Sequence, residues 1–266
     1  MTKPNVLILR APGTNCDQET GFAFEQAGGQ ATILHVNRVL ENASLLDDFQ
    51  ILCLPGGFSF GDDVAAGRIL AGVMQRHLAD ELRKFRDDGK LILGICNGFQ
   101  VLIKSGLLLA DDQQGPPATL TWNDSGRFDD RWVRLSVQGD GGPFLSGVSE
   151  MYLPIAHAEG KFVARDEATL EQLRSAGHLV LRYAPLDAAA RADFNPDSDI
   201  LPTPDNPNGS DASVAGIRDA TGRVLGLMPH PERHIDPTHH PRWTRGEAGE
   251  QGDGLAMFQG AINYFA

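Results

Sequence analysis

The sequence contains no apolar stretch that approaches the ~20 residues of a membrane-spanning helix. Its first residues, MTKPNVLILR, also lack an apolar segment long enough for a signal peptide, so we expect a cytoplasmic location. Lysine and arginine, 23 together, are outnumbered by 35 aspartates and glutamates, and no basic cluster occurs, which argues against a nucleic-acid-binding surface. These absences favour a soluble enzyme with neither a membrane nor a nucleic acid as its partner.

Only three cysteines occur, an odd number that builds no disulfide framework and suits a reducing compartment. Cys53 lies in the apolar run 51–54, so we predict that it packs in a buried strand as a small hydrophobic side chain. Cys16 is predicted to open the first helix, where a helix start lowers a thiol pKa, but no histidine lies near it in the sequence. For Cys16 we therefore favour a structural or site-lining role over that of a nucleophile.

Neither a G-K-[ST] phosphate loop nor a dinucleotide fingerprint is present, so we expect no nucleotide site of standard type and no cofactor in this chain. His234, His239 and His240, with Asp236 among them, invite interpretation as a metal cluster. Their irregular spacing and the intervening prolines match no usual ligand arrangement. We favour a solvated loop there and expect no metal site.

Residues 91–100, LILGICNGFQ, are the most informative segment of the chain. An apolar run breaks at Gly94 and continues after Gly98 as an amphipathic pattern, which predicts a strand, a tight turn and a helix with Cys96 at the apex. Small flanking residues let the chain turn sharply and expose the nucleophile, and a helix start favours thiolate over thiol. Cys96 is therefore the predicted nucleophile.

A proton shuttle for this cysteine is offered by the segment Met228-Pro-His-Pro-Glu232. Pro231 biases His230 toward extended geometry, in which His230 and Glu232 point to the same side. A carboxylate beside an imidazole fixes its tautomer and stabilises its charged form, so the imidazole can take the thiol proton and later protonate a leaving amine. We predict a triad of Cys96, His230 and Glu232, the alternative being that Pro-His-Pro is only a rigid surface turn.

The first half of the chain alternates short apolar segments with helical patterns. Predicted strands cover 5–10, 31–36, 50–54 and 90–95, and predicted helices cover 16–28, 62–87 and 97–106. Apolar runs without polar alternation are typical of parallel strands covered on both faces. The site of such a sheet lies at the carboxyl ends of its strands, where Cys96 and the turn 55–57 fall. The helix predicted at 62–87 has apolar residues on a helical period that indicates core packing: Val64, Ile69, Val73 and Leu78.

The second half has shorter, more alternating segments, among them 120–122, 132–137 and 214–217, with Thr221-Gly222 as a hairpin turn. These segments predict antiparallel additions to the sheet. We expect residues 1–266 to form a single domain. Within it, 187–205 and 235–251 are rich in proline and polar residues, which predicts loop insertions.

Several motifs resemble one enzyme family. Residues 96–100 fit a C-x-G-x-Q elbow and 230–232 fit the downstream H-x-E pair of the triad (class I) glutamine amidotransferases. Within that family the chain is similar to the glutaminase subunits of phosphoribosylformylglycinamidine synthase in these motifs: APGTNCD (11–17), PGGFSFGDD (55–63), HAEGKF (157–162), NPNGS (206–210) and GLMPHPE (226–232). The resemblance runs from about residue 5 to the C-terminus and implies a flavodoxin-like α/β fold with an open, mostly parallel sheet.

The resemblance implies that Cys96 attacks the side-chain amide of L-glutamine and that Gln100 helps to bind this substrate. The backbone N–H of Asn97, which follows the nucleophile, is expected to stabilise the oxyanion. The resemblance adds the N–H of Gly57 to that oxyanion hole. It also implies that ammonia passes to a separate synthetase subunit, dependent on ATP and Mg, which converts formylglycinamide ribonucleotide to its amidine in purine biosynthesis. Some members use a small bridging subunit.

Two other functions stay open from the sequence: an independent cysteine hydrolase or peptidase on the same fold, and a non-catalytic regulatory subunit. The H-x-E pair argues against the first, because it accompanies the C-x-G-x-Q elbow of the glutamine enzymes. The intact set of Cys96, His230 and Glu232 argues against the second. His157 and Glu159 lie in a family motif, where they either line the site or the partner contact, or form a hydrogen-bonded structural pair.

Overall fold

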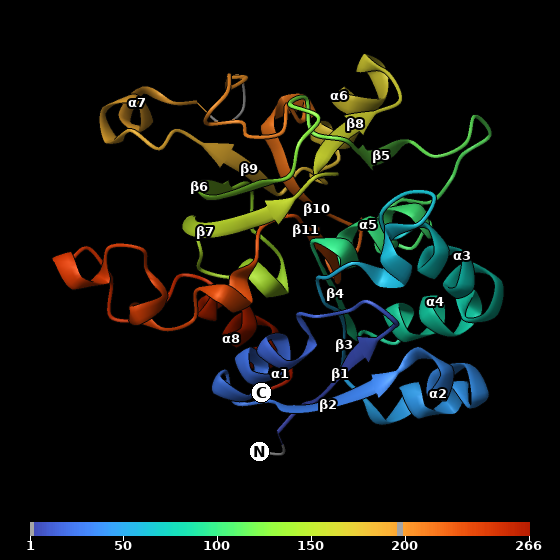
Figure 1. The fold of residues 1–266 in the computed structure, drawn as a ribbon. Helices are drawn as coiled ribbons and strands as arrows, with labels where there is room; N and C mark the ends of the chain where they lie inside the picture. The colour runs from blue at the N-terminus through green and yellow to red at the C-terminus, as the bar shows by residue number, and fades with distance from the viewer. Residues whose placement is uncertain (1–2, 196–198) are drawn as a thin grey trace.

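The computed structural model describes residues 3–195 and 199–266. Its centre is a nine-stranded sheet with the strand order β2-β1-β3-β4-β11-β10-β9-β6-β7 (Figure 1). The parallel half consists of β1 (Asn5–Arg10), β2 (Gln30–His35), β3 (Ile51–Leu54), β4 (Leu91–Ile95) and β11 (Val224–Leu227). The antiparallel half consists of β10 (Val214–Arg218), β9 (Leu181–Ala184), β6 (Asp129–Val137) and β7 (Glu150–His157).

The parallel strands are buried because helices cover both of their faces. Figure 1 shows two of these helices on one side of the parallel strands, α1 (Asp17–Gln26) and α8 (Leu255–Asn263). On the other side lie α3 (Arg68–His77), α4 (Ala79–Asp87) and α5 (Asn97–Lys104). Every residue of β3, β4 and β11 is buried. The prediction of an open α/β sheet with antiparallel additions is confirmed.

Smaller elements complete the fold. A two-stranded antiparallel sheet joins β5 (Ala118–Thr121) to β8 (Lys161–Ala164), and the helices α2 (Val36–Glu41) and α6 (Glu167–Ser175) follow β2 and β8. Short 3-10 helices lie at Ala43–Asp48, Ser59–Asp62, Pro143–Leu145, Asp211–Ser213, Pro231–Arg233, Pro237–His239 and Trp243–Arg245. The predicted hairpin at 221–222 joins β10 to β11, and β11 returns parallel to β4.

The single helix predicted at 62–87 is wrong. The structure has two helices, which meet at Leu78, and an irregular segment before Arg68. Val64 has a φ of 72° and is 89% exposed, so it does not pack in the core. The reason is tertiary: Ala66 N–H donates to the Glu159 carboxylate, and Gly67, at a φ of 72°, lies against the backbone of α5. These contacts hold the segment in a shape that a helix could not adopt.

The two predicted insertions differ in content. Residues 187–205 begin with the short helix α7 (Ala188–Asp193), and 196–198 within them lie outside the described residues. Residues 235–251, all described, contain two 3-10 turns and otherwise irregular chain. Our expectation of a solvated loop is wrong for His234, which is buried and whose Nδ1–H donates to the carbonyl of Tyr152 at 2.7 Å.

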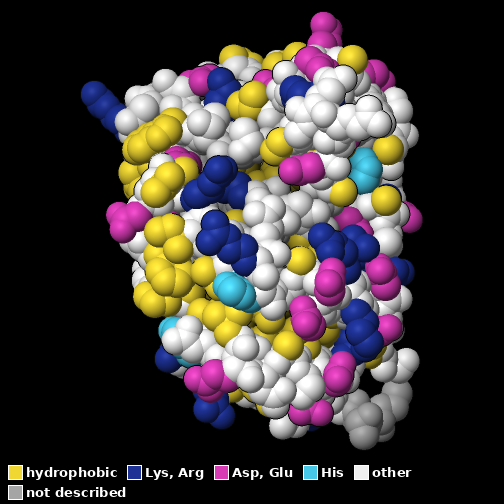
Figure 2. All heavy atoms as spheres, turned by 90° about the vertical axis from the view of Figure 1, so that its right-hand side faces the viewer, with side chains coloured by type: hydrophobic (Ala, Val, Ile, Leu, Met, Phe, Trp, Pro, Cys, Tyr) yellow, Lys and Arg dark blue, Asp and Glu magenta, His cyan; other side chains and the backbone are white. Residues whose placement is uncertain are grey.

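No helix in the described ranges combines the length and apolar character needed to cross a bilayer. Figure 2 views the side of the molecule formed largely by α3, α4 and α5, and acidic and basic side chains are interspersed over it. Several of these charges pair locally, as in Arg83 with Asp80 and Lys84 with Asp88. Such exposed pairs each contribute at most ~1 kcal/mol to stability.

Candidate active site

Cys96 occupies the turn between β4 and α5 in a strained backbone conformation, with φ 50° and ψ −104°. A non-glycine residue in this region persists only where the surroundings enforce it, and such strain clusters at active sites. The flanking glycines permit the turn. A Cβ on Gly98 would lie 1.9 Å from the carbonyl oxygen of Leu54, and a Cβ on Gly94 would lie 2.6 Å from a methyl group of Leu102. The G-x-C-x-G spacing is therefore a steric requirement of this elbow.

His230 follows the end of β11 and lies at the same edge of the sheet as Cys96. The parallel register pairs Leu227 of β11 with Ile95 of β4, so the two strands end side by side. Pro231 then opens a 3-10 turn that turns Glu232 back toward the imidazole. His230 Nδ1 lies 2.6 Å from Oε1 of Glu232, and both side chains are buried. Nδ1 therefore carries the proton donated to Glu232, which leaves Nε2 as the free nitrogen.

The protonation of His230 is set by opposing effects. Burial disfavours the charged imidazole, but the Glu232 carboxylate and the sulfurs of Cys96 and Cys16 favour it, so the pKa of His230 lies well above its ordinary value. Within the described chain, His230 Nε2 is buried and has no hydrogen-bond partner. An imidazole that holds a proton readily and has one free nitrogen is suited to accept a thiol proton and to return it.

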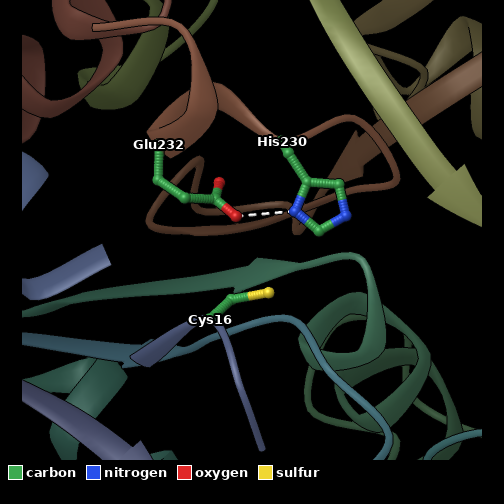
Figure 3. A group of neighbouring side chains, drawn as sticks. All are labelled: Cys16, His230 and Glu232. Carbon is green, nitrogen blue, oxygen red and sulfur yellow. Dashed lines mark hydrogen bonds and ion pairs between the residues drawn. The ribbon is translucent and has the colours of Figure 1, made fainter. Parts of the chain in front are cut away.

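Cys16 also lies beside His230, 214 residues away in the sequence. Figure 3 shows its sulfur directed toward the His230–Glu232 pair from the start of α1. A Cβ placed on Gly56 would lie 3.0 Å from this sulfur and 2.8 Å from His230 Cε1, so Cys16 and His230 pack on either side of this glycine. Burial raises the pKa of the Cys16 thiol. Cys16 therefore lies buried beside the His230–Glu232 pair.

The donor atoms of Cys16, His230 and Glu232 lie within 4.8 Å of one another, a set that resembles metal ligands in type. Two contacts oppose a cation there. Nδ1 of His230 is engaged with Glu232, and the guanidinium of Arg233 donates to the Cys16 sulfur at 3.2 Å. Arg233 in turn donates to Glu19 at 2.9 Å. A metal ion would have to displace a positive charge already in place.

A pocket of about 230 Å³ opens beside Cys96. It is lined by Gly57, Phe58, Asp62, Ala66, Cys96, Gln100, Trp122, Ala156, His157, Ala158 and Glu159. The backbone N–H groups of Gly57 and Asn97 form no hydrogen bond with any described residue. Gly57 has a φ of 132°, and a Cβ there would lie 2.7 Å from the backbone nitrogen of Asn15, so only glycine fits. Two unpaired donors are thus available near Cys96.

Gln100, the last residue of the C-x-G-x-Q elbow, lines the pocket and also ties it together. Its Nε2 donates to the carbonyl of Glu159 at 2.7 Å, and its Oε1 accepts from Nδ2 of Asn97 at 2.9 Å. Asn97 Nδ2 donates as well to Asp62 at 3.0 Å, and Asn97 Oδ1 accepts from the N–H of Ser59. This network fixes the wall of the pocket relative to the elbow.

His157 and Glu159 both line the pocket, and each has its own structural partner. His157 Nδ1 lies 3.1 Å from Oδ1 of Asn123, and Glu159 accepts from the N–H of Ala66. Burial, with a smaller contribution from the charge of His230, lowers the pKa of His157 to about 3, so this imidazole is neutral. Burial and the nearby Glu159 raise the pKa of Asp62 to about 6. Asp62 and Asn123 were not identified from the sequence; the 55–63 motif was the available signal for Asp62.

Comparison with known proteins places the chain in a family. A family model described as a CobB/CobQ-like glutamine amidotransferase domain matches residues 3–265. A Dehalococcoides mccartyi protein named phosphoribosylformylglycinamidine synthase subunit PurQ is 43% identical over 265 residues, covering 99% of this chain and 98% of its own length. A Thermus thermophilus protein of the same name is 36% identical, covering 97% and 98% of the two chains.

Two solved structures are similar as well. A chain of PurLQS from Thermotoga maritima has a TM-score of 0.73 at 33% identity and covers 100% of both chains. A putative GMP synthase subunit from Thermoplasma acidophilum has a TM-score of 0.55 at 16% identity, covering 99% of this chain and 94% of its own, which shows a shared fold.

Proposed function

The chain belongs to the CobB/CobQ-like glutamine amidotransferases, among the glutaminase subunits of phosphoribosylformylglycinamidine synthase, and we propose that Cys96, His230 and Glu232 carry its hydrolysis of L-glutamine. The observation that carries this assignment is the strained elbow of Cys96 beside a histidine whose Nδ1 is bound by Glu232 and whose Nε2 is free. This is the arrangement of a nucleophile, a general base and an orienting acid.

The reaction follows from these positions. His230 Nε2 takes the proton of the Cys96 thiol, and the thiolate sulfur attacks the carboxamide carbon of glutamine. The oxyanion that forms is stabilised by the free N–H groups of Gly57 and Asn97. The imidazolium, held by Glu232, then protonates the departing amine, and the C–N bond breaks to release ammonia and leave a thioester on Cys96. Water, deprotonated by His230, hydrolyses the thioester to glutamate and regenerates the thiol.

The ammonia serves the synthetase subunit of the enzyme, which converts formylglycinamide ribonucleotide to formylglycinamidine ribonucleotide in purine biosynthesis. We propose that ATP and Mg are consumed by that partner and that this chain needs no cofactor. The proposed roles of this chain's residues support the division, because the glutaminase half-reaction requires a thiol, an imidazole and water alone. A reduced Cys96 also suits a cytoplasmic location, which we propose for the complex.

We further propose that residues 1–266 form one domain, with 187–205 and 235–251 as loops on it. The support is the sheet, in which β11 of the parallel half pairs directly with β10 of the antiparallel half. The proposed triad also combines Cys96, from the first half of the sequence, with His230 and Glu232, from its second half. A boundary between the halves would have to cut through this sheet.

An active-site label tests the proposed catalytic residues. The purified chain, mixed with its synthetase subunit, is exposed to an electrophilic glutamine analogue with and without excess L-glutamine, and the modified peptide is mapped by mass spectrometry. We expect one label on Cys96 that glutamine suppresses, and unchanged labelling in a Cys53→Ser control. A label on Cys16, or a label on Cys96 that glutamine leaves unaffected, would overturn the assignment.

A further inference from the structure

Two carboxylates line the pocket that holds the nucleophile. Asp62 comes from the 3-10 turn after β3, and Glu159 comes from the turn between β7 and β8. They are close enough for Glu159 to raise the pKa of Asp62. None of the described residues that line the pocket is a lysine or an arginine. Placing two acids together in a pocket is costly, and function commonly explains such an arrangement.

One cation lies near this pair without lining the pocket. Lys104 interacts with both carboxylates through charge, but its Nζ donates to the carbonyl oxygens of Ala66 at 2.8 Å and Leu120 at 3.3 Å. Lys104 is thus held by backbone carbonyls and forms no hydrogen bond to either carboxylate in the described chain. Glu159 Oε2 accepts from the N–H of Ala66, and no hydrogen bond of the described chain uses its Oε1. The pocket retains acceptor capacity and room for a second positive charge.

His157 gives an independent indication of the ligand. Asn123 Oδ1 accepts from the N–H of Gly160, and Asn123 Nδ2 donates to the carbonyl oxygens of Arg127 and His157. These bonds fix which end of the Asn123 amide is the oxygen and which is the nitrogen. Its Oδ1 must also accept from Nδ1–H of His157. The proton of the neutral imidazole is then on Nδ1, and Nε2 is an acceptor. That Nε2 is buried and without a partner in the described chain, although the ring lines the pocket.

A pocket with two carboxylates and an unsatisfied imidazole acceptor fits a ligand rich in donors. L-glutamine, with its carboxamide at Cys96, brings an α-ammonium of three N–H groups and one positive charge. We propose that Asp62 and Glu159 bind the α-ammonium of L-glutamine and that His157 Nε2 accepts a further hydrogen bond from the substrate. This inference rests on the proposed function. This subsite restricts the enzyme to amides that bear an α-ammonium. Gln100 forms hydrogen bonds to both Asn97 and the Glu159 carbonyl, and it thereby positions this subsite relative to Cys96.

Steady-state kinetics with two amides tests this subsite. The complete complex with the synthetase subunit is assayed with L-glutamine and with glutaramate, the same amide without its α-ammonium. We expect the wild type to prefer glutamine strongly in kcat/KM. Glu159→Gln and Asp62→Asn should each raise KM for glutamine about tenfold or more, the effect of one lost hydrogen bond to a charged group, while kcat for glutamine stays within about threefold.

The glutaramate rates separate recognition from a structural role. If the carboxylates bind the α-ammonium, kcat/KM for glutaramate is unchanged in both variants, and their preference for glutamine shrinks accordingly. Equal losses for both amides would overturn the proposal, as would variants that retain the full preference. Asp80→Asn, on the exposed face of α4, is the matched control and should behave as wild type.

Binding measured without turnover provides a second test. Alkylation of Cys96 by iodoacetamide should be slowed by glutamine but not by glutaramate in the wild type, and glutamine should protect Glu159→Gln only at concentrations about tenfold higher or more. Equal protection by both amides would overturn the subsite. Failure of the proposed function is distinguishable, because the wild-type complex would then hydrolyse neither amide and glutamine would not protect Cys96.

Discussion

The carboxylate of Glu232 holds Nδ1 of His230 at 2.6 Å, and neither side chain is open to solvent. This bond fixes the tautomer that leaves Nε2 as the proposed base, and the carboxylate supplies the negative charge that stabilises an imidazolium. The second oxygen of Glu232 has no partner in the described part of the chain, so the residue is committed to the histidine alone.

Glu232→Gln should therefore lower kcat for glutamine at least about 100-fold, the usual contribution of a well-poised general acid and base, with little change in KM. The glutamine amide preserves shape but can present N–H to Nδ1 and favour the wrong tautomer. Ammonia release by the complex is the measurement. Glu150→Gln, at the exposed start of β7, is the control. Wild-type turnover in Glu232→Gln would contradict the proposed role.

The three cysteines should differ in reactivity. Cys96 lines the pocket, whereas Cys16 and Cys53 are closed off from solvent, and burial raises the pKa of both of their thiols. Since the thiolate is the reactive form, native protein treated with iodoacetamide should be modified at Cys96 well before the other two sites. Urea should equalise the three rates. Faster modification of Cys16 than of Cys96 in the native protein would reverse our assignment of the nucleophile.

Gly98→Ala should destabilise the fold strongly, because the new methyl carbon would lie 1.9 Å from the backbone oxygen of Leu54 in β3. Overpacking against backbone costs about 3 kcal/mol or more, since a strand cannot move aside as a flexible side chain does. Gly72→Ala in α3 is the matched control: open space surrounds that position, and alanine should be neutral or stabilise by up to about 1 kcal/mol. Urea unfolding of both variants measures the difference. Equal stabilities would refute the steric account of the elbow.

Much of this site could be predicted from local sequence. A buried parallel strand requires a continuous apolar run, so β1, β3 and β4 were recognisable, and the elbow was readable because its glycines serve a local turn. The proximity of Cys16 to His230 depends on how α1 and β11 pack across the sheet, and no sequence period encodes that. The helix predicted at 62–87 failed for a related reason. Its apolar spacing was compatible with a helix, but contacts to Glu159 and to α5 determine the chain before Arg68.

Asp62 links the proposed substrate subsite to the stability of the fold. Burial and the Glu159 charge raise the pKa of Asp62. Contacts to Gly67, Asn97 and Lys104 lower it by less, so the pKa moves from 3.8 to about 6. Between these values the folded state binds more protons than the unfolded state, so this group's contribution to stability falls as pH rises through the window and stays low above it.

Asp62→Asn removes the ionisation while its amide oxygen can still accept from Asn97. We expect it to stabilise the protein at pH 7.5 by about 1 kcal/mol, a value reduced for the partial solvent exposure of this carboxylate, and to have little effect near pH 4. Urea unfolding at the two pH values measures the change, with Asp80→Asn as the exposed control. Stabilisation of the same size at both pH values would show that ionisation of Asp62 is not its cause. A variant that is more stable at pH 7.5 yet binds glutamine more weakly would show that the strain of the paired acids is maintained for the substrate.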